Sequence, residues 1–350
     1  MKRVALIASV GFGESSSSGQ IIRSRILLDQ LRKHYGDRGV YLINTSDYKR
    51  RFLAILFRTV WSVLCCDCYI IMLSGSGRRV FFPILTRFKK WFRKHLFNNI
   101  IGGDYGLFLQ KNPRFVAYSN AFDVNWVQMP SMKKEVEHEG VRNVEVLPNS
   151  KPLVILPPEA LPAVVEKPYR FCTFSRVTKE KGIEDAIRAI EEINRKAGET
   201  VAELTIYGKP DEDYAKTFEE IMRGVSSAVH YGGVVVFDET TEVLKDYYML
   251  LFPTVFYGEG FPGTILDAYA SGLPVIASDW KFNPELIREG KTGFVYDHKD
   301  YAAFVSCIDA AIRQPEKICA MREKCLEEAK RYTPEIVMPI IFRAIDSVRG

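Results

Sequence analysis

Residues 252–279, FPTVFYGEGFPGTILDAYASGLPVIASD, decide the fold of this chain. The stretch opens at the end of an apolar, strand-like segment and passes through a loop that carries Glu259. Pro262 suits the first position of a helix, and Gly272 suits the residue that ends it. A second apolar segment, Val275–Ser278, follows directly. Strand, loop, helix and strand in this order predict a parallel β-α-β unit.

The same alternation of apolar and amphipathic runs continues on both sides of this unit. In the second half it predicts a helix over Ile183–Ala197 and strands at Phe171–Phe174, Ala202–Tyr207, Val234–Phe237, Met249–Phe252 and Val275–Ser278. In the first half it predicts a glycine-rich loop at 11–19, a helix over Ile21–Tyr35 and strands at Val4–Val10, Val40–Ile43, Cys68–Leu73, Trp126–Gln128 and Val144–Leu147. Short apolar runs are typical of strands buried on both faces of a parallel sheet. We therefore predict an α/β fold with two Rossmann-like, doubly wound domains facing a central cleft, where ligands bind at the carboxyl ends of strands.

The domain boundaries follow from length and from a change in composition. A chain of 350 residues exceeds one ordinary core, so two domains are expected. We predict an N-terminal domain at 1–156, a linker rich in proline and alanine at 157–168, and a C-terminal domain at 169–333. The last amphipathic stretch, 334–350, is expected to pack back on the first domain.

Charge and cysteine content narrow the class of protein. A net charge of +5 is too small to indicate nucleic-acid binding by itself. Seven irregularly spaced cysteines, among them Cys65, Cys66 and Cys68, favour reduced core thiols in a cytoplasm over disulfides or a metal site. The N-terminus does not resemble a signal peptide. Residues 52–73 contain two charges that a membrane span would bury, so a helix followed by a buried strand explains them better.

Two charged segments of the C-terminal domain point to a phosphate-containing ligand. Free N–H groups at Gly263 and Thr264 would form a phosphate site at a helix N-terminus, and Asp267 would share their face one turn later. Arg176 and Lys181 follow the first strand of this domain and would hold a pyrophosphate. Taken singly, the acidic residues could equally be favoured by the helix dipole, and the basic residues are more often solvated surface. Their joint occurrence in one domain favours the ligand.

These segments resemble the retaining GT-B glycosyltransferases of family 4, also called glycosyl transferases group 1, of the polysaccharide-biosynthesis type. The family's first motif is similar to Ser175-Arg176…Lys181-Gly182, and its second to Glu259-Gly260-Phe261-Pro262…Asp267-Ala268, closed by Gly-Leu-Pro-Val from Gly272. The resemblance covers most of the chain, since Leu147-Pro148-Asn149 also matches. It implies a metal-independent, hexosyltransferase-type enzyme that uses a nucleotide-sugar donor, most simply a UDP-sugar, and no separate cofactor.

The resemblance also assigns roles to residues. Arg176 and Lys181 would bind the donor diphosphate, and Glu259 would contact the transferred sugar. Asp267 would bind the ribose, and Gly19 would approach the donor phosphate from the first domain. The backbone of the second motif, with Gly208 in the base-binding loop, would complete the donor site; the residues are Gly260, Phe261, Gly263 and Thr264.

Three departures from the family pattern concern the site. Asp267 replaces a glutamate, and Pro262 replaces a glycine and removes one backbone donor. The family's first-domain histidine has no obvious counterpart, the nearest candidates being His95 and Asp104. The segment Asp211-Glu-Asp213 superficially resembles a metal-binding motif, but an N-cap role is expected for it.

The acceptor is expected to bind the first domain. Residues 78–97 interleave cations with aromatic side chains, a pattern typical either of a helix packed on the sheet or of a face that touches anionic membrane. We predict a cytoplasmic enzyme, at the inner face of the cell membrane, that acts on a glycan or lipid-linked acceptor in capsule or cell-envelope polysaccharide assembly. It is not expected to bind nucleic acid.

Two rival interpretations remain. The missing histidine allows a catalytically weak nucleotide-sugar-binding subunit of a biosynthetic complex. The glycine-rich loop after Val10 allows a nicotinamide oxidoreductase, although it lacks a regular Gly-x-Gly-x-x-Gly pattern.

Overall fold

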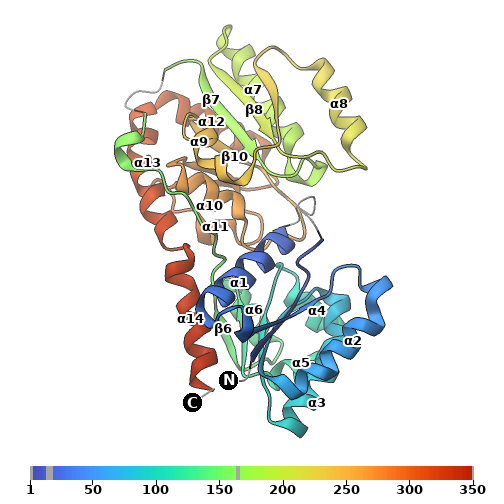
Figure 1. The fold of residues 1–350 in the computed structure, drawn as a ribbon. Helices are drawn as coiled ribbons and strands as arrows, with labels where there is room; N and C mark the ends of the chain where they lie inside the picture. Colours follow the sequence, from blue (N-terminus) through green and yellow to red (C-terminus); the bar gives the residue numbers. More distant parts are fainter. Residues whose placement is uncertain (1–2, 13–18, 163–165, 349–350) are drawn as a thin grey trace. The chain divides into compact units, whose positions relative to one another are not determined.

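The computed structural model describes residues 3–12, 19–162 and 166–348. Most of the glycine-rich loop 11–19, part of the predicted linker 157–168 and the last two residues of the predicted helix 334–350 therefore lie outside the described residues. The chain divides into two compact units, each of which is described by itself (Figure 1). The first contains Met1–Pro152 and Thr333–Gly350, and the second contains Leu153–Tyr332.

The division at Pro152 precedes the predicted boundary at 156. Beyond it the chain bonds to the second unit, because the Thr241 hydroxyl donates to the Val154 carbonyl at 2.6 Å. The Leu156 N–H likewise donates to the Ala270 carbonyl at 2.8 Å. The described part of the predicted linker thus belongs to the second unit.

The first unit is a parallel six-stranded sheet between helices. Its strands lie in the order β2-β1-β3-β4-β5-β6. Its elements are β1 (Arg3–Ala8), α1 (Gly19–Tyr35), β2 (Val40–Asn44), α2 (Tyr48–Cys65), β3 (Cys66–Met72), α3 (Gly75–Phe92), β4 (His95–Asn99), α4 (Tyr105–Lys111), α5 (Arg114–Asn120), β5 (Val124–Val127), α6 (Pro130–His138), β6 (Val144–Val146) and α14 (Pro334–Ser347).

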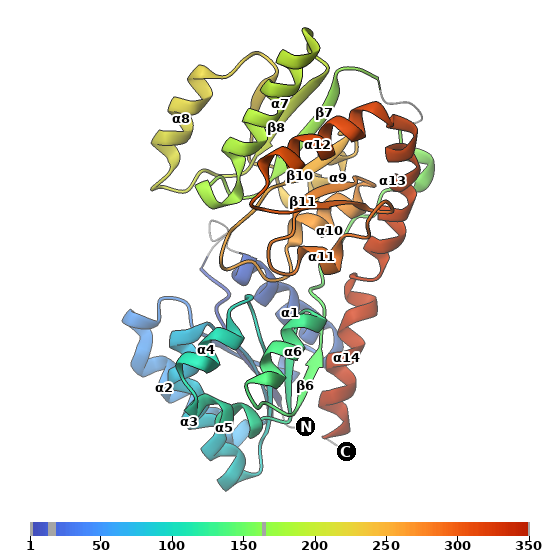
Figure 2. The same ribbon diagram turned by 180° about the vertical axis from the view of Figure 1, so that it is seen from behind.

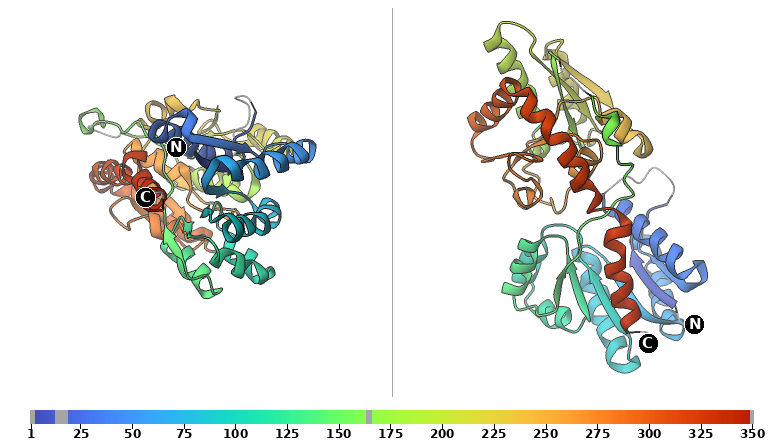
Figure 3. Two further views of the ribbon diagram at one scale, coloured as in Figure 1. Left: turned by 60° about the horizontal axis from the view of Figure 1, so that its bottom comes forward. Right: turned by 90° about the vertical axis from the view of Figure 1, so that its left-hand side faces the viewer.

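Alternate residues of β3 pack on the two helical layers of this unit. Cys68 and Met72 belong to a core with α1 and α14, and Figure 3 shows α14 alongside the first sheet. On the other face, the Tyr69 hydroxyl lies 3.0 Å from that of Ser62 in α2, and its ring contacts Phe88 of α3. Residues 52–73 are therefore a helix and a buried strand, as predicted. Among the described helices, none combines the length and apolar character that crossing a bilayer requires.

The second unit is also a parallel six-stranded sheet. Its strands lie in the order β12-β11-β10-β7-β8-β9. Its elements are β7 (Tyr169–Phe174), the 3-10 turn η3 (Lys179–Lys181), α7 (Ile183–Ala197), β8 (Ala202–Tyr207), α8 (Ala215–Gly224), β9 (Val229–Gly233), α9 (Thr240–Leu244), β10 (Met249–Phe252), α10 (Gly263–Ala270), β11 (Val275–Ser278), α11 (Asn283–Leu286), β12 (Gly293–Tyr296), α12 (Tyr301–Arg313) and α13 (Pro315–Lys330). Helices α7 and α12 share one core with this sheet (Figure 2).

The strand predicted at Val234–Phe237 is wrong. The sixth strand, β9, instead comprises Val229–Gly233 and pairs with β8. Val234 and Val236 are exposed beyond the strand. Their β-branched side chains raise strand propensity, but pairing with a neighbouring strand decides the outcome.

Candidate functional site

The predicted donor residues of the second unit gather where its strand order reverses. β7 pairs with β8 on one side and with β10 on the other, so consecutive connections leave the sheet in opposite directions at this point. Such a switch point leaves a crevice at the carboxyl ends of the strands, where α/β proteins bind ligands. The loop after β7 carries Arg176 and Lys181, and the loop after β10 carries Glu259. The topology therefore brings the two predicted motifs to one place.

Lys181 and Glu259 form an ion pair at this point. The Lys181 ammonium lies 2.5 Å from Glu259 Oε2, and each side chain is only 10% exposed. The buried Thr254 hydroxyl donates to the same carboxylate oxygen at 3.2 Å. The Lys181 ammonium also lies 5.0 Å from the ring centroid of Phe256, within cation–π range. A cation and a carboxylate thus lie together in a largely desolvated position between the loops after β7 and β10.

Backbone contact between the two loops holds this pair in place. The Val255 N–H donates to the Glu180 carbonyl at 2.7 Å. Gly182 has φ +71°, and a Cβ there would lie 2.3 Å from the Pro253 carbonyl oxygen. Only glycine fits that approach, which explains the Lys-Gly step of the first motif.

Arg176 contacts the same Phe256 ring as Lys181 but is more exposed to solvent. Its guanidinium lies 5.6 Å from the Phe256 ring centroid and 3.1 Å from an Asp211 carboxylate oxygen, with about half of the side chain exposed. The predicted N-cap role of Asp211-Glu-Asp213 is wrong, because Tyr214 occupies the N-cap position of α8 and no side chain caps that helix. Asp211 instead provides a counter-charge for Arg176.

Gly208 lies beside this loop for a steric reason. It has φ +133°, and a Cβ at this position would lie 1.7 Å from the Ser175 carbonyl oxygen. The end of β8 can therefore approach the Ser-Arg step closely. The carbonyl of Gly208 accepts a hydrogen bond from the Tyr231 hydroxyl at 2.9 Å.

The first turn of α10 lies at the same edge of the sheet. Thr264 Oγ1 donates to the carbonyl of Phe174, the last residue of β7, at 2.7 Å. The helix begins at Gly263, so Pro262 is its N-cap with an extended ψ of 120° rather than its first residue. The first N–H groups of a helix have no intrahelical partner and attract anions. The hydrogen bond from Thr264 to Phe174 holds this first turn of α10 beside the end of β7.

The remaining second-motif residues are buried. Asp267 is only 6% exposed and lies one turn into α10. The side chain of Phe261 packs edge-to-face on Tyr332, with ring centroids 5.1 Å apart. Phe261 and Gly260 would therefore offer a ligand their backbone rather than a side chain.

The first-unit candidates do not gather at one edge of their sheet. His95 opens β4, at the amino end of the strand, and contacts Asp123 there at 3.5 Å. Asp104 precedes α4, beyond the opposite end of β4. Because parallel sheets bind ligands at their carboxyl ends, His95 is a poor counterpart of the family's histidine. Gly19 begins α1, where an added Cβ would meet no described atom within 4 Å.

The segment 78–97 does not form a single exposed face. Arg78, Phe81, Phe82, Phe88 and Lys94 are buried, so these residues do not contribute to an exposed face. They are needed to cover the sheet, as the packed-helix interpretation expects. The exposed cations and aromatics lie mainly at the end of α3, where Trp91 is 66% exposed.

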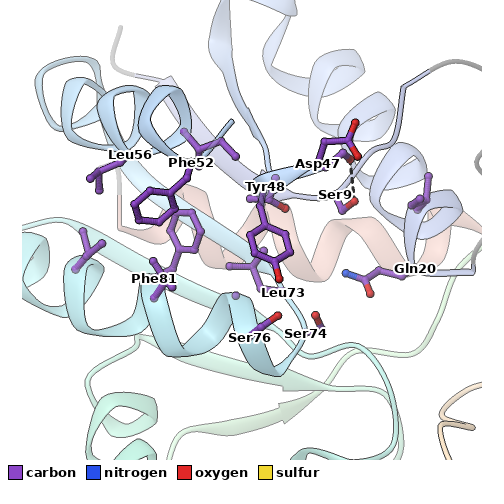
Figure 4. A pocket seen from close by; sticks show the side chains of 17 residues that line it. Ser9, Gln20, Asp47, Tyr48, Phe52, Leu56, Leu73, Ser74, Ser76 and Phe81 are labelled. Carbon is purple, nitrogen blue, oxygen red and sulfur yellow. Dashed lines mark hydrogen bonds between the residues drawn. The ribbon is translucent and has the colours of Figure 1, made fainter. Parts of the chain in front are cut away.

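The first unit contains a pocket that sequence reasoning missed. It encloses about 330 Å³ at the carboxyl ends of β1, β2 and β3, between α2 and α3 (Figure 4). One end is apolar, with Phe52, Leu56 and Phe81, and the other is polar, with Ser9 and Asp47. The sequence did contain a signal for this pocket, because polar residues follow each of the strands β1, β2 and β3.

Comparison with known proteins finds a family match within the second unit. Residues 168–314 match the family model described as Glycosyl transferases group 1. The GtfA subunit of a UDP-N-acetylglucosamine–peptide N-acetylglucosaminyltransferase from Streptococcus pneumoniae is 28% identical over 51% of this chain and 34% of that protein. A GDP-mannose-dependent alpha-(1-6)-phosphatidylinositol monomannoside mannosyltransferase from Mycolicibacterium smegmatis is 28% identical over 45% and 41%, respectively. The amylovoran biosynthesis glycosyltransferase AmsK of Erwinia amylovora is 28% identical over 41% and 36%. The matched parts span about two-fifths or less of these relatives' lengths.

Solved structures resemble the whole chain. Anabaena Alr3699/HepE in complex with UDP-glucose has a TM-score of 0.75 at 16% identity, covering 99% of this chain and 100% of that one. The lipopolysaccharide outer core galactosyltransferase WaaB has a TM-score of 0.69 at 19% identity, covering 99% of each chain. At these identities the likeness concerns the fold alone. It confirms the predicted GT-B fold.

Proposed function

We propose, from the match of residues 168–314 to the glycosyl transferases group 1 model and from the GT-B fold of the chain, that the protein transfers a sugar from a nucleotide-diphosphate sugar to an acceptor. The observation that carries the proposal is the Lys181–Glu259 pair beside the first turn of α10. A cation, a carboxylate and helix N–H groups at one switch point suit a ligand with both phosphates and sugar hydroxyls.

Each residue of this site then has a role. Arg176, Lys181 and the first N–H groups of α10 hold the diphosphate and stabilise its charge as it leaves. Glu259 accepts hydrogen bonds from the transferred sugar, and Asp267 accepts them from the two ribose hydroxyls. Lys181 must then share its charge between Glu259 and the diphosphate, so donor binding reorganises the pair.

The first experiment is calorimetric titration with UDP-glucose, UDP-N-acetylglucosamine, UDP-galactose and GDP-mannose, combined with assays of donor hydrolysis. We expect one of them to bind and be hydrolysed slowly without acceptor, a UDP-sugar first of all. Failure of the whole panel to bind or react would refute the proposal. Tight binding of NAD instead would revive the oxidoreductase interpretation.

We further propose that transfer retains the anomeric configuration and needs no metal. Retention is supported by the resemblance of the Lys181 and Glu259 motifs to those of retaining enzymes. Metal independence is supported by the pairing of Asp211 with Arg176, which gives that carboxylate another role. NMR of the first-formed product would show an inverted anomer if retention were wrong. Activity lost in EDTA and restored by Mg²⁺ or Mn²⁺ would contradict metal independence.

For the acceptor we propose a lipid-linked glycan, in assembly of capsule or cell-envelope polysaccharide at the cytoplasmic face of the membrane. The pocket between α2 and α3 supports this class of acceptor, because it joins an apolar end to a polar end. Relatives named for phosphatidylinositol mannoside and amylovoran synthesis are in keeping with it. Transfer to a lipid-linked glycan but not to the same glycan without lipid is the expected result.

A second candidate function follows from the similarity to a protein named as a GtfA subunit. In this alternative the chain binds a nucleotide sugar but transfers it only within a complex. Sugar transfer by the purified chain alone would exclude the alternative. Donor binding without any transfer to a panel of lipid-linked acceptors would favour it.

A further inference from the structure

Helix α2 exposes a row of large apolar side chains. Each is between 53% and 79% exposed, although the residues lie in the middle and end of an ordered helix. Phe57 and Trp61 stack on each other, with ring centroids 6.3 Å apart. We call the row the outer face of α2; it comprises Leu53, Phe57, Val60, Trp61 and Leu64.

Helical spacing makes this row continuous. Leu53, Phe57 and Leu64 recur at intervals that return to one side of a helix. Ile55, buried with Thr59 and Ser62, marks the opposite side that covers the sheet. A helix that is apolar on all sides is normally buried in a core or in a membrane. The outer face of α2 has no such cover in the described chain.

The charged residues within helices α2 and α3 are all basic. Helices α2 and α3 contain nine lysines and arginines and no aspartate or glutamate; the basic residues are Lys49, Arg50, Arg51, Arg58, Arg78, Arg79, Arg87, Lys89 and Lys90. The whole chain has a net charge of only +5, so the rest of it is net acidic. Lys49 and Arg50 are exposed beside the start of the row. Arg78 is buried, so the positive charge shown beside the apolar face is that of the exposed Lys49 and Arg50.

We propose that the outer face of α2 docks on the surface of an anionic lipid bilayer, with the helix lying in the plane of the interface. Aliphatic side chains such as Leu53 and Leu64 gain from burial among acyl chains, and adjacent cations gain about 1 kcal/mol each near anionic headgroups. Nucleic acid would attract the cations through its phosphates but would not bury the aliphatic side chains of the row. The four charges of α2 forbid spanning and suit lying on the surface.

Docking by α2 also explains where the pocket opens. Tyr48 and Phe52 line the pocket, yet about half of each side chain is exposed. Figure 4 shows Tyr48 with its hydroxyl toward Ser74 and Ser76, and Phe52 at the apolar end. A lipid chain leaving the bilayer along α2 would enter the apolar end first. This last step rests on the proposed transfer to a lipid-linked acceptor; membrane docking itself does not.

The test is co-flotation of the full chain with vesicles, without donor or acceptor. The chain should float with mixed phosphatidylglycerol and phosphatidylcholine vesicles, and much less with phosphatidylcholine alone or at high salt. The double variant Phe57→Asn/Leu64→Asn should reduce the partition coefficient about tenfold or more, because it removes two large apolar groups. The matched control is Ile336→Asn, which alters an exposed apolar residue of α14 in the same unit. It should float like the unaltered chain.

Three results would overturn the proposal. These are no flotation of the unaltered chain with anionic vesicles, equal flotation of the α2 variant, or a dimer in sedimentation experiments that the α2 variant abolishes. The dimer would assign the face to a second copy. Thermal unfolding and slow donor hydrolysis should be unchanged in the α2 variant. Loss of flotation with intact hydrolysis, or the reverse, therefore separates failure of docking from failure of the donor function.

Discussion

The ammonium of Lys181 lies 2.5 Å from the carboxylate of Glu259, although 78 residues separate them in the sequence. Each comes from a loop at the carboxyl end of a neighbouring strand, and each is largely buried. The pair links the two motifs of the second unit. Without a ligand, Glu259 supplies the counter-charge that the buried Lys181 ammonium needs. With the proposed donor bound, the same ammonium would also have to contact the diphosphate.

Replacing Lys181 by Met should abolish most of the transfer activity. The diphosphate would lose a cation at the point where charge develops, so we expect turnover to fall about a hundredfold or more. Lys179→Met is the matched control, since Lys179 lies exposed in the same turn. Steady-state assays with the preferred donor compare the two. Equal losses in both variants would remove Lys181 from the site.

The same pair makes a prediction about stability. Removing one partner of a buried ion pair leaves the other charge uncompensated, at a cost of about 3 kcal/mol. Lys181→Met and Glu259→Gln should each lower the free energy of unfolding in urea. The double variant should lose less than the sum of the two, because no unpaired charge remains. Strictly additive losses would mean that the pair is not formed in solution.

Gly182→Ala should damage the second unit far more than Gly198→Ala. Both glycines have a positive φ, +71° and +72°, so both variants suffer about 1 kcal/mol or more of backbone strain. Only at Gly182 does the added Cβ meet a carbonyl oxygen, at 2.3 Å, whereas Gly198 has open space. We expect a total loss of about 3 kcal/mol and weaker donor binding for Gly182→Ala. Similar melting temperatures in both variants would contradict the close packing of the two loops.

Asp267→Asn should weaken donor binding through the ribose. The unaltered chain should bind a 2′-deoxyribose donor more weakly than the natural donor, because the carboxylate loses one charge-assisted hydrogen bond. In Asp267→Asn the two donors should bind with nearly equal affinity. Calorimetry on all four combinations measures the coupling. A variant that still discriminates between them would place the ribose elsewhere.

Burial of Cys172 predicts a decline in stability at alkaline pH. Burial raises the pKa of this thiol well above its usual range, so the thiol stays protonated in the folded protein. The unfolded chain releases the proton above about pH 8.5, and stability then falls by roughly 1.4 kcal/mol per pH unit for each such thiol. Cys172→Ala should have a shallower decline between mildly and strongly alkaline pH in urea titrations. An unchanged slope would contradict the shift.

The sequence predicted the strands that are apolar throughout better than those that contain polar residues. Met249–Phe252 and Val275–Ser278 are the observed β10 and β11, because a strand buried on both faces must be apolar throughout. β4 escaped prediction because buried Asn98 and Asn99 form its end, where Asn98 bonds to Asn125 across the sheet. That partner could not be known before the strands were aligned.

Some residues of the candidate site could likewise be predicted from the sequence, and others could not. Spacing and residue type made Lys181, Glu259 and Asp267 candidates, since their chemistry would be carried by side chains within recognisable motifs. The buried Thr254, which donates to Glu259, gave no separate signal. The outer face of α2 was hidden for a different reason: its leucines and aromatics read as core until the other side of the helix was seen to cover the sheet.

Helix α14 has a consequence for how the chain matures on the ribosome. Val337, Met338, Ile341 and Ile345 complete the core of the unit that contains the first strand. The second unit, Leu153–Tyr332, is synthesised entirely before this helix. The first unit therefore cannot complete its core until the whole second unit has been synthesised. Until then, the apolar side chains that α14 covers remain exposed. A nascent chain of this design is most exposed to capture by chaperones or to aggregation until α14 is available to cover the first unit.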